Sequence, residues 1–138
     1  MHKDDVSKLS SLGSSTQYQY QEPHADILET FPNKFSGRPY EVNLIFPEFT
    51  SLCPKTGQPD FATITIRYTP DAECIESKSL KLYLFAFRNH GSFMETITNT
   101  ILQDIVVKCN PIKCTVIGDF AARGGIRIRV IARHRQAK

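Results

Sequence analysis

The sequence has no apolar run long enough to cross a membrane as a helix. Its longest apolar stretch, residues 82–87, reads LYLFAF and falls far short of the roughly 20 residues that such a helix needs. The amino-terminal segment also lacks the succession of basic, apolar and small residues that marks a secretory signal. We therefore expect a cytoplasmic protein.

Cysteine is sparse, and its spacing forms neither a disulfide framework nor a CxxC pair. The four cysteines are Cys53, Cys74, Cys109 and Cys114, and this distribution favours reduced thiols with no metal site. A G-x-G-x-x-G segment after a strand is also missing, so the residue pattern alone does not indicate a dinucleotide site.

The length and composition fit one small domain. The chain has 138 residues, of which 41% are hydrophobic, enough for a single core. Residues 1–21 are polar and aperiodic, which predicts a flexible amino-terminal arm before a domain at residues 22–134 and a basic tail at residues 135–138. A net charge of +3 is too small to indicate nucleic acid by itself, although anionic ligands are plausible.

Alternating apolar and polar residues predict four strands. Residues 40–46 form the first, ended by Pro47, and residues 60–68 form a second strand antiparallel to it. Two further strands are expected at residues 113–120 and 125–132, joined by a glycine turn at residues 123–125.

A helical period separates the two strand pairs. A first helix begins near Ser77 and ends before Gly91, and a capping box of Ser92 and Glu95 begins a second helix that runs to about Lys108. The order ββααββ predicts an α+β fold with two helices on one face of a four-stranded antiparallel sheet. Because the edges of such a sheet need cover, we expect an oligomer that closes into a barrel.

Cys53 is the best candidate for a nucleophile. It stands in a loop between two strands, where reactive side chains are often displayed, although an arbitrary cysteine is more often buried and structural. The other three cysteines keep that structural interpretation. Asp60 follows across a turn-rich spacer and could transfer protons, but from spacing alone a strand-starting acceptor of a backbone hydrogen bond is the commoner role.

Two motifs resemble a known family. The loop FTSLCPKTGQPDFATI at residues 49–64 and the helix entry ESKSLKLYLFAFRNHG at residues 76–91 are similar to those of the unimodular 7-cyano-7-deazaguanine reductases, with the resemblance extending from about residue 31 to residue 128. That family has the tunnelling fold, in which subunits assemble into barrels. The resemblance implies an enzyme that makes the 7-aminomethyl-7-deazaguanine precursor of queuosine.

The resemblance also implies a mechanism. Cys53 would add to the nitrile carbon of the deazapurine to give a covalent thioimide, which hydride from NADPH reduces in two rounds to the amine. Asp60 would be the acid that protonates the developing nitrogen anion, which would require a raised pKa.

Further site residues are carried over from the family by position. Glu95 matches the carboxylate that holds the guanine-like edge of the substrate, although it is also the expected capping partner of Ser92. A second substrate segment matches Ile75, Glu76 and Ser77, for which helix initiation is the ordinary explanation. Met94 stands where the family commonly has histidine, so an imidazole contribution is absent there, and His90 or water could substitute.

Three cations match positions that meet the cofactor phosphates in the family. They are Lys78, Lys81 and Arg123, and on composition alone they would be a solvated helix face and a surface turn residue.

Two other functions stay open from the residues. One is a zinc-dependent pterin-type cyclohydrolase of the same fold, which needs three or four Cys and His ligands. The other is a non-catalytic module that binds RNA through a basic ridge of Arg127, Arg129, Arg133, Arg135 and Lys138.

Overall fold

A computed structural model describes Ser7 and residues 22–137 of the chain. The expected amino-terminal arm, apart from Ser7, and Lys138 lie outside the described residues. The elements run in the order η1 (Ala25–Ile27), β1 (Thr30–Pro32), β2 (Val42–Leu52), β3 (Pro59–Thr69), β4 (Glu73–Ile75), α1 (Ser77–Phe85), α2 (Met94–Cys109), β5 (Lys113–Phe120) and β6 (Arg129–Arg135).

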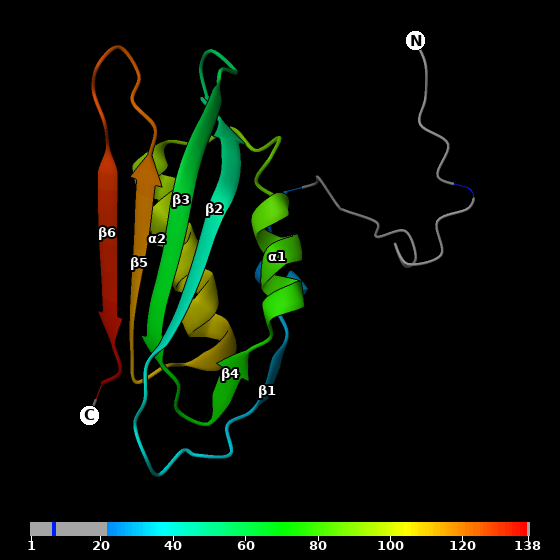
Figure 1. Ribbon diagram of the computed structural model, residues 1–138, viewed down its shortest axis with the longest axis vertical. Coiled ribbons are helices and arrows are strands. Elements are labelled where there is room, and N and C mark those ends of the chain that lie inside the picture. Colours follow the sequence, from blue (N-terminus) through cyan, green and yellow to red (C-terminus); the bar gives the residue numbers. More distant parts are fainter. Residues whose placement is uncertain (1–6, 8–21, 138) are drawn as a thin grey trace.

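The main sheet has four antiparallel strands in the order β2-β3-β5-β6. Along β3, Ile64, Ile66 and Tyr68 are buried while Arg67 is exposed, so the alternation seen in the sequence separates a core face from an open face. Figure 1 shows α1 and α2 on one side of this sheet. The α+β fold with helices on one face is confirmed.

The first strand was expected to end at Pro47, but it continues past this residue. β2 continues to Leu52, and its register against β3 shifts between Phe46 and Phe49. At this bulge two residues of β2 face one residue of β3, and β2 lies at the sheet edge, so the missing N–H of proline disrupts no ladder on its outer side.

The expected capping box is also wrong. Phe93 is the amino-terminal cap of α2, and it makes no side-chain capping hydrogen bond. The helix starts at Met94, so Ser92 and Glu95 do not occupy the cap and third helical positions that the motif requires. The first helix also ends early, at Phe85, with turns filling the stretch before Gly91.

A small second sheet was not expected. β1 and β4 are three-residue strands that pair antiparallel, and the N–H of Ile75 donates to the buried Tyr68 hydroxyl at 2.9 Å. This contact holds the entry to α1 against the end of β3.

The last strand also differs from its expected limits. β6 begins at Arg129, because Arg123 and Ile126 first form a bridged turn, and it ends at Arg135. The backbone N–H of Gln136 then donates to Ile112 O, and its side-chain amide donates to Asp71. The folded part of the chain therefore extends past residue 134.

The core lies between the sheet and the two helices. Ile97, Ile101 and Ile105 of α2 are fully buried at helical spacing. α2 packs tightly on β5 at Gly118, where an added Cβ would clash with Thr98 Oγ1. No helix among the described residues is long and apolar enough to span a membrane.

Candidate active site

The turn between β2 and β3 displays Cys53. Leu52 and Pro59 are the last pair of the ladder, and beyond them the N–H of Cys53 donates to Gln58 O at 2.9 Å while the N–H of Gly57 donates to Cys53 O at 3.0 Å. Gly57 has φ 72°, a left-handed conformation that favours glycine. The thiol is partly exposed on a turn fixed by backbone hydrogen bonds.

Hydrogen-bond donors around Cys53 lower the pKa of its thiol to about 6. The largest cause is the hydroxyl of Thr56, followed by the backbone N–H groups of Thr56 and Lys55 and by the guanidinium of Arg123. Because this pKa lies below 7, the reactive thiolate predominates at neutral pH.

The other cysteines lie in the core. Burial raises the pKa of Cys109 and of Cys114 to about 12, and Cys74 is buried beside the Tyr40 hydroxyl at 3.4 Å. These environments agree with the structural interpretation of the three residues. Cys53 differs from them in exposure and in its surrounding donors.

Asp60 and Arg123 form a bidentate ion pair next to Cys53. Arg123 Nε donates to Asp60 Oδ1 at 2.6 Å, and Arg123 Nη2 donates to Asp60 Oδ2 at 2.7 Å. The carboxylate is 4% exposed and the guanidinium 33%, so Arg123 covers Asp60 from the solvent side. Hydrogen bonds to Asp60, then to Cys53, raise the pKa of Arg123.

Arg123 reaches this position from a tight turn. Its backbone exchanges two hydrogen bonds with Ile126 at 2.9 Å each, and the intervening Gly124 and Gly125 have φ 55° and 83°. Both residues adopt conformations that disfavour a side chain. The glycine turn expected from the sequence therefore serves to bring a cation beside the thiol.

The connection between the helices lies along the Cys53 turn. The N–H of Leu52 donates to His90 O and the N–H of Ser92 donates to Leu52 O, both at 3.1 Å. Between them, an added Cβ on Gly91 would lie 3.3 Å from the Cα of Pro54. This close backbone contact places the amino-terminal end of α2 beside Cys53.

A hollow of about 310 Å³ lies where these segments meet. Cys53, Asp60 and Arg123 line it together with Met94 and Glu95 at the start of α2. Apolar walls come from Pro54, Phe93, Ile126 and Ile128. Glu95 is exposed and free of a capping role, so its carboxylate is available to a ligand in the hollow.

The structure thus brings together half of the predicted site residues. The other five, Ile75, Glu76, Ser77, Lys78 and Lys81, lie at the beginning of α1. Ile75 contacts Tyr68, which is eight residues from Asp60 on β3, or roughly 26 Å along the strand. Figure 1 shows the β2–β3 connection and β4 at opposite ends of the sheet.

Glu76 has a structural role in this chain. Its carboxylate caps α1 by accepting from the N–H groups of Lys78 at 2.8 Å and Ser79 at 2.6 Å. These bonds, Ser79 first, lower the pKa of Glu76. Ile75 is buried, whereas Ser77 and Lys78 are exposed and Lys81 is half-buried.

Sequence reasoning missed Ser51. It faces Asp60 directly across the β2–β3 ladder, is fully buried, and its hydroxyl has no hydrogen-bond partner among the described residues. The position two residues before Cys53 within the loop motif was the available signal. Phe93 was missed as well, and its side chain is 65% exposed beside the hollow.

The part of the chain that the structure describes contains no set of zinc ligands of the kind that a zinc-dependent cyclohydrolase would need. Within Ser7 and residues 22–137, no group of three or more His, Cys, Asp or Glu side chains is arranged to hold a metal ion. A tetrahedral site would need such a group.

Comparison with known proteins places the chain in a family. The family model described as QueF-like protein matches residues 59–138. The chain is 57% identical over 129 residues to the NADPH-dependent 7-cyano-7-deazaguanine reductase of Nitratidesulfovibrio vulgaris, covering 94% of this chain and 78% of that protein. The reductase of the same name from Porphyromonas gingivalis is 52% identical over 126 residues, covering 91% of this chain and 81% of that protein.

A solved structure supports the fold. The archaeosine synthase QueF-Like in the apo form superposes with a TM-score of 0.66 at 19% identity, covering 73% of this chain and 99% of that one. At this identity the likeness concerns the fold alone. The sequence matches show that the chain belongs to the QueF family, that of the NADPH-dependent 7-cyano-7-deazaguanine reductases.

Proposed function

We propose that this chain reduces the nitrile of 7-cyano-7-deazaguanine to the primary amine, with NADPH as the reductant. The observation that carries the proposal is the hollow at Cys53, where a thiol with a pKa of about 6 lies beside a buried carboxyl group and a free carboxylate. Family membership supports the same reaction, because the relatives are named for it. The amine product is the precursor of queuosine.

Cys53 is the proposed nucleophile. Its thiolate adds to the nitrile carbon, one C–N π bond opens, and the nitrogen takes a proton, which leaves a thioimide on the sulfur. A nitrile is a weak electrophile, so a thiolate already formed at neutral pH removes one barrier to the addition. NADPH, when bound, supplies the hydride for each of the two reductions.

Asp60 is the proposed proton donor, and Arg123 controls it. In the ion pair, both carboxylate oxygens of Asp60 accept hydrogen bonds from Arg123, so the pair competes with a contact between Asp60 and a substrate. The pair must open before Asp60 donates. Entry of the substrate between Cys53 and Asp60 would open the pair, so the thioimide can form before NADPH binds, and the freed Arg123 can then meet a cofactor phosphate, the role implied by the family.

Glu95 is proposed to hold the guanine-like edge of the substrate. Its carboxylate can accept from the ring N–H and the exocyclic amine together. Because the capping box is absent, this contact does not cost α2 a hydrogen bond. Met94, 8% exposed at the wall of the hollow, contributes an apolar surface where the family commonly has histidine.

A second copy of the chain is proposed to complete the site. Residues 75–77, Lys78 and Lys81 lie at the end of the sheet opposite Cys53, so one chain cannot direct them into its own hollow. A barrel in which one subunit places the start of α1 beside the Cys53 hollow of another would join the two groups. In that arrangement Lys78 and Lys81 supply cations for the cofactor phosphates.

The direct test is a mass measurement on the purified chain mixed with 7-cyano-7-deazaguanine and no NADPH. We expect one adduct with the mass of the substrate on Cys53, absent in Cys53→Ala and retained in Cys109→Ala, which changes a buried thiol outside the hollow. Addition of NADPH should discharge the adduct and consume the reduced nicotinamide. Lack of an adduct together with lack of NADPH consumption would refute the proposal.

The cytoplasmic location expected from the sequence stays a prediction.

A further inference from the structure

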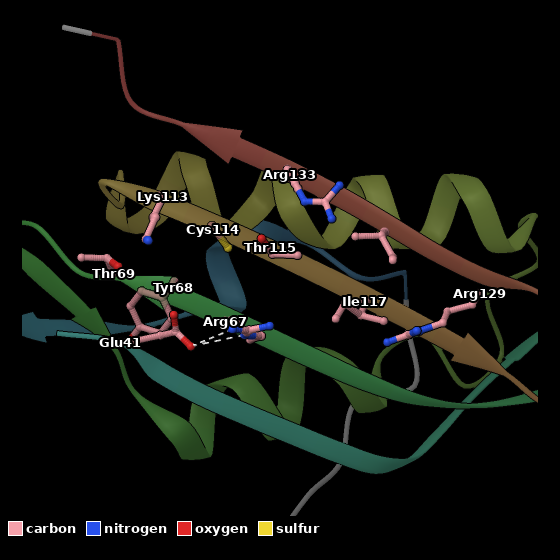
Figure 2. A pocket seen from close by; sticks show the side chains of 11 residues that line it. Glu41, Arg67, Tyr68, Thr69, Lys113, Cys114, Thr115, Ile117, Arg129 and Arg133 are labelled. Carbon is pink, nitrogen blue, oxygen red and sulfur yellow. Dashed lines mark hydrogen bonds and ion pairs between the residues drawn. The ribbon is translucent and has the colours of Figure 1, made fainter.

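A cluster of cations occupies the sheet face that the helices leave open. Arg67 of β3, Lys113 of β5 and Arg133 of β6 project from this face around a hollow of about 300 Å³, which Arg129 of β6 also lines. Figure 2 shows them over the strands, with the helices behind the sheet. The hollow shares no lining residue with the one at Cys53, and the proposed reaction does not use it.

The strand register makes these three cations converge. Arg67 pairs with Thr115 across β3 and β5, and Thr115 pairs with Arg133 across β5 and β6. The two arginines therefore flank one threonine hydroxyl with their Cα atoms about 10 Å apart. Lys113 lies two residues from Thr115 on the same face of β5. Three cationic side chains can thus reach a single group bound above Thr115.

Carboxylates neutralise little of this charge. Among the described residues, Glu41 pairs with Arg67 through one oxygen at 3.2 Å, and both side chains are partly exposed. Both oxygens of Asp119 instead accept hydrogen bonds from Arg127. Like charges held this close repel one another, and an anion with several charges would relieve that repulsion.

An aliphatic patch borders the cluster of cations on one side. Ile117 and Ile131 are directly paired neighbours on β5 and β6, two residues along from Thr115 and Arg133, and both line the same hollow. Ile131 is 41% exposed. The surface therefore offers cations for phosphates and, beside them, an aliphatic patch on which a flat ring can lie.

We propose that this face binds a nucleoside diphosphate or triphosphate, with the phosphates at Arg67, Lys113 and Arg133 and the nucleoside over Ile117 and Ile131. Arg and Lys recognise phosphate through charge-assisted hydrogen bonds. A long nucleic acid strand fits less well, because Glu41 places a carboxylate at the Arg67 side of the hollow. A short polyanion can lie within the hollow without passing Glu41.

The experiment is calorimetric titration of the full chain with ATP, inorganic tripolyphosphate and adenosine. We expect one ATP per chain, competition by tripolyphosphate, and affinity that falls with salt. Arg133→Gln and Lys113→Gln should each weaken ATP binding about tenfold. Ile131→Thr should weaken ATP but not tripolyphosphate, which separates the nucleoside contact from the phosphate contact.

Two controls keep the test independent of folding and of reductase activity. Arg38→Gln removes an exposed arginine outside this face and should leave ATP binding unchanged. Glu41→Gln should strengthen binding, because it frees Arg67 and removes a repulsive charge, and misfolding cannot produce a gain. The proposal would be overturned if the chain does not bind ATP, or if Arg133→Gln and Lys113→Gln bind ATP as tightly as the wild-type chain does. It would also be overturned if a single-stranded RNA oligonucleotide binds more tightly than ATP on the same residues.

Discussion

At the residue scale, the reactivity of Cys53 depends on the groups that donate hydrogen bonds to its sulfur. The Thr56 hydroxyl contributes most, ahead of backbone N–H groups and Arg123. Each donor stabilises the thiolate relative to the thiol, so each lowers the pKa. A side chain three residues away in the sequence therefore sets the pH range in which the site can act.

This dependence predicts the pH profile of Cys53 alkylation. The rate with iodoacetamide should be half-maximal near pH 6, fall as the thiolate is protonated below that pH, and stay level above pH 7. Thr56→Val removes the largest donor and should move the midpoint upward, toward the ordinary thiol range. A wild-type rate that keeps rising through pH 8 would contradict the assignment, and Cys53→Ser provides the background rate.

Two glutamates at helix starts should respond differently to the same change. Glu95→Gln should raise the substrate KM at least tenfold and leave the melting temperature unchanged, because Glu95 makes no capping bond. Glu76→Gln should lower the free energy of unfolding by about 1 kcal/mol, since the Glu76 carboxylate caps α1 through two N–H groups. Steady-state kinetics and thermal melts of both variants measure the contrast. Equal destabilisation would count against it.

At the element scale, strands with a clean alternation could be predicted from sequence, and short or interrupted ones could not. The limits of β5 were predicted at both ends, while β1 and β4 have three residues each, too few to show a period. Pro47 was taken as a strand end because its effect depends on whether the strand lies at an edge. Whether a strand lies at an edge is determined by the strand order of the sheet, which the residue itself does not indicate.

The candidate site shows the same division. Cys53 could be singled out from its place in a loop, while Asp60 and Glu95 were assigned by the resemblance of single segments to family motifs. The ion pair of Asp60 with Arg123 joins residues 63 apart in the chain, and nothing local indicates that the glycine turn returns to the Cys53 loop. The cap was wrongly expected at Ser92 because the S-x-x-E spacing was present, while the helix starts one residue later, with Phe93 as its cap.

The contact between α2 and β5 at Gly118 predicts a sharp stability effect. An added Cβ would lie 2.4 Å from Thr98 Oγ1 and 2.8 Å from Phe120, both within the buried core. Gly118→Ala should therefore lower the free energy of unfolding by about 1–3 kcal/mol in urea denaturation. Gly37→Ala, whose Cβ would meet nothing within 4 Å, is the matched control. A neutral Gly118→Ala would mean that α2 can move away from the sheet at little cost.

At the scale of the whole molecule, the chain exposes apolar surface far from its core. Phe93 and Ile126 are each at least 65% exposed and line the Cys53 hollow, while Phe61 is 60% exposed and lines a separate hollow. Burial of such side chains against another copy would be favourable. Their position agrees with the proposal that a second subunit covers the hollow.

A shared site predicts complementation between two inactive variants. Cys53→Ala lacks the nucleophile, and Lys78→Glu reverses the charge of an exposed side chain proposed to meet the cofactor phosphates in the neighbouring subunit's site. When the two are unfolded together and refolded as mixed oligomers, some sites should combine intact halves and regain NADPH consumption. Refolding each variant alone is the control. Activity that never exceeds the sum of the separate samples would indicate that each chain carries a complete site.

The bulge in β2 also bears on how such an assembly can grow. At this edge of the sheet Pro47 offers no N–H, and the residues around it are out of step with the regular ladder. An incoming strand can thus pair along only part of β2. The interrupted edge is a poor template for endless strand addition, which protects a chain with an open sheet from amyloid-like polymerisation.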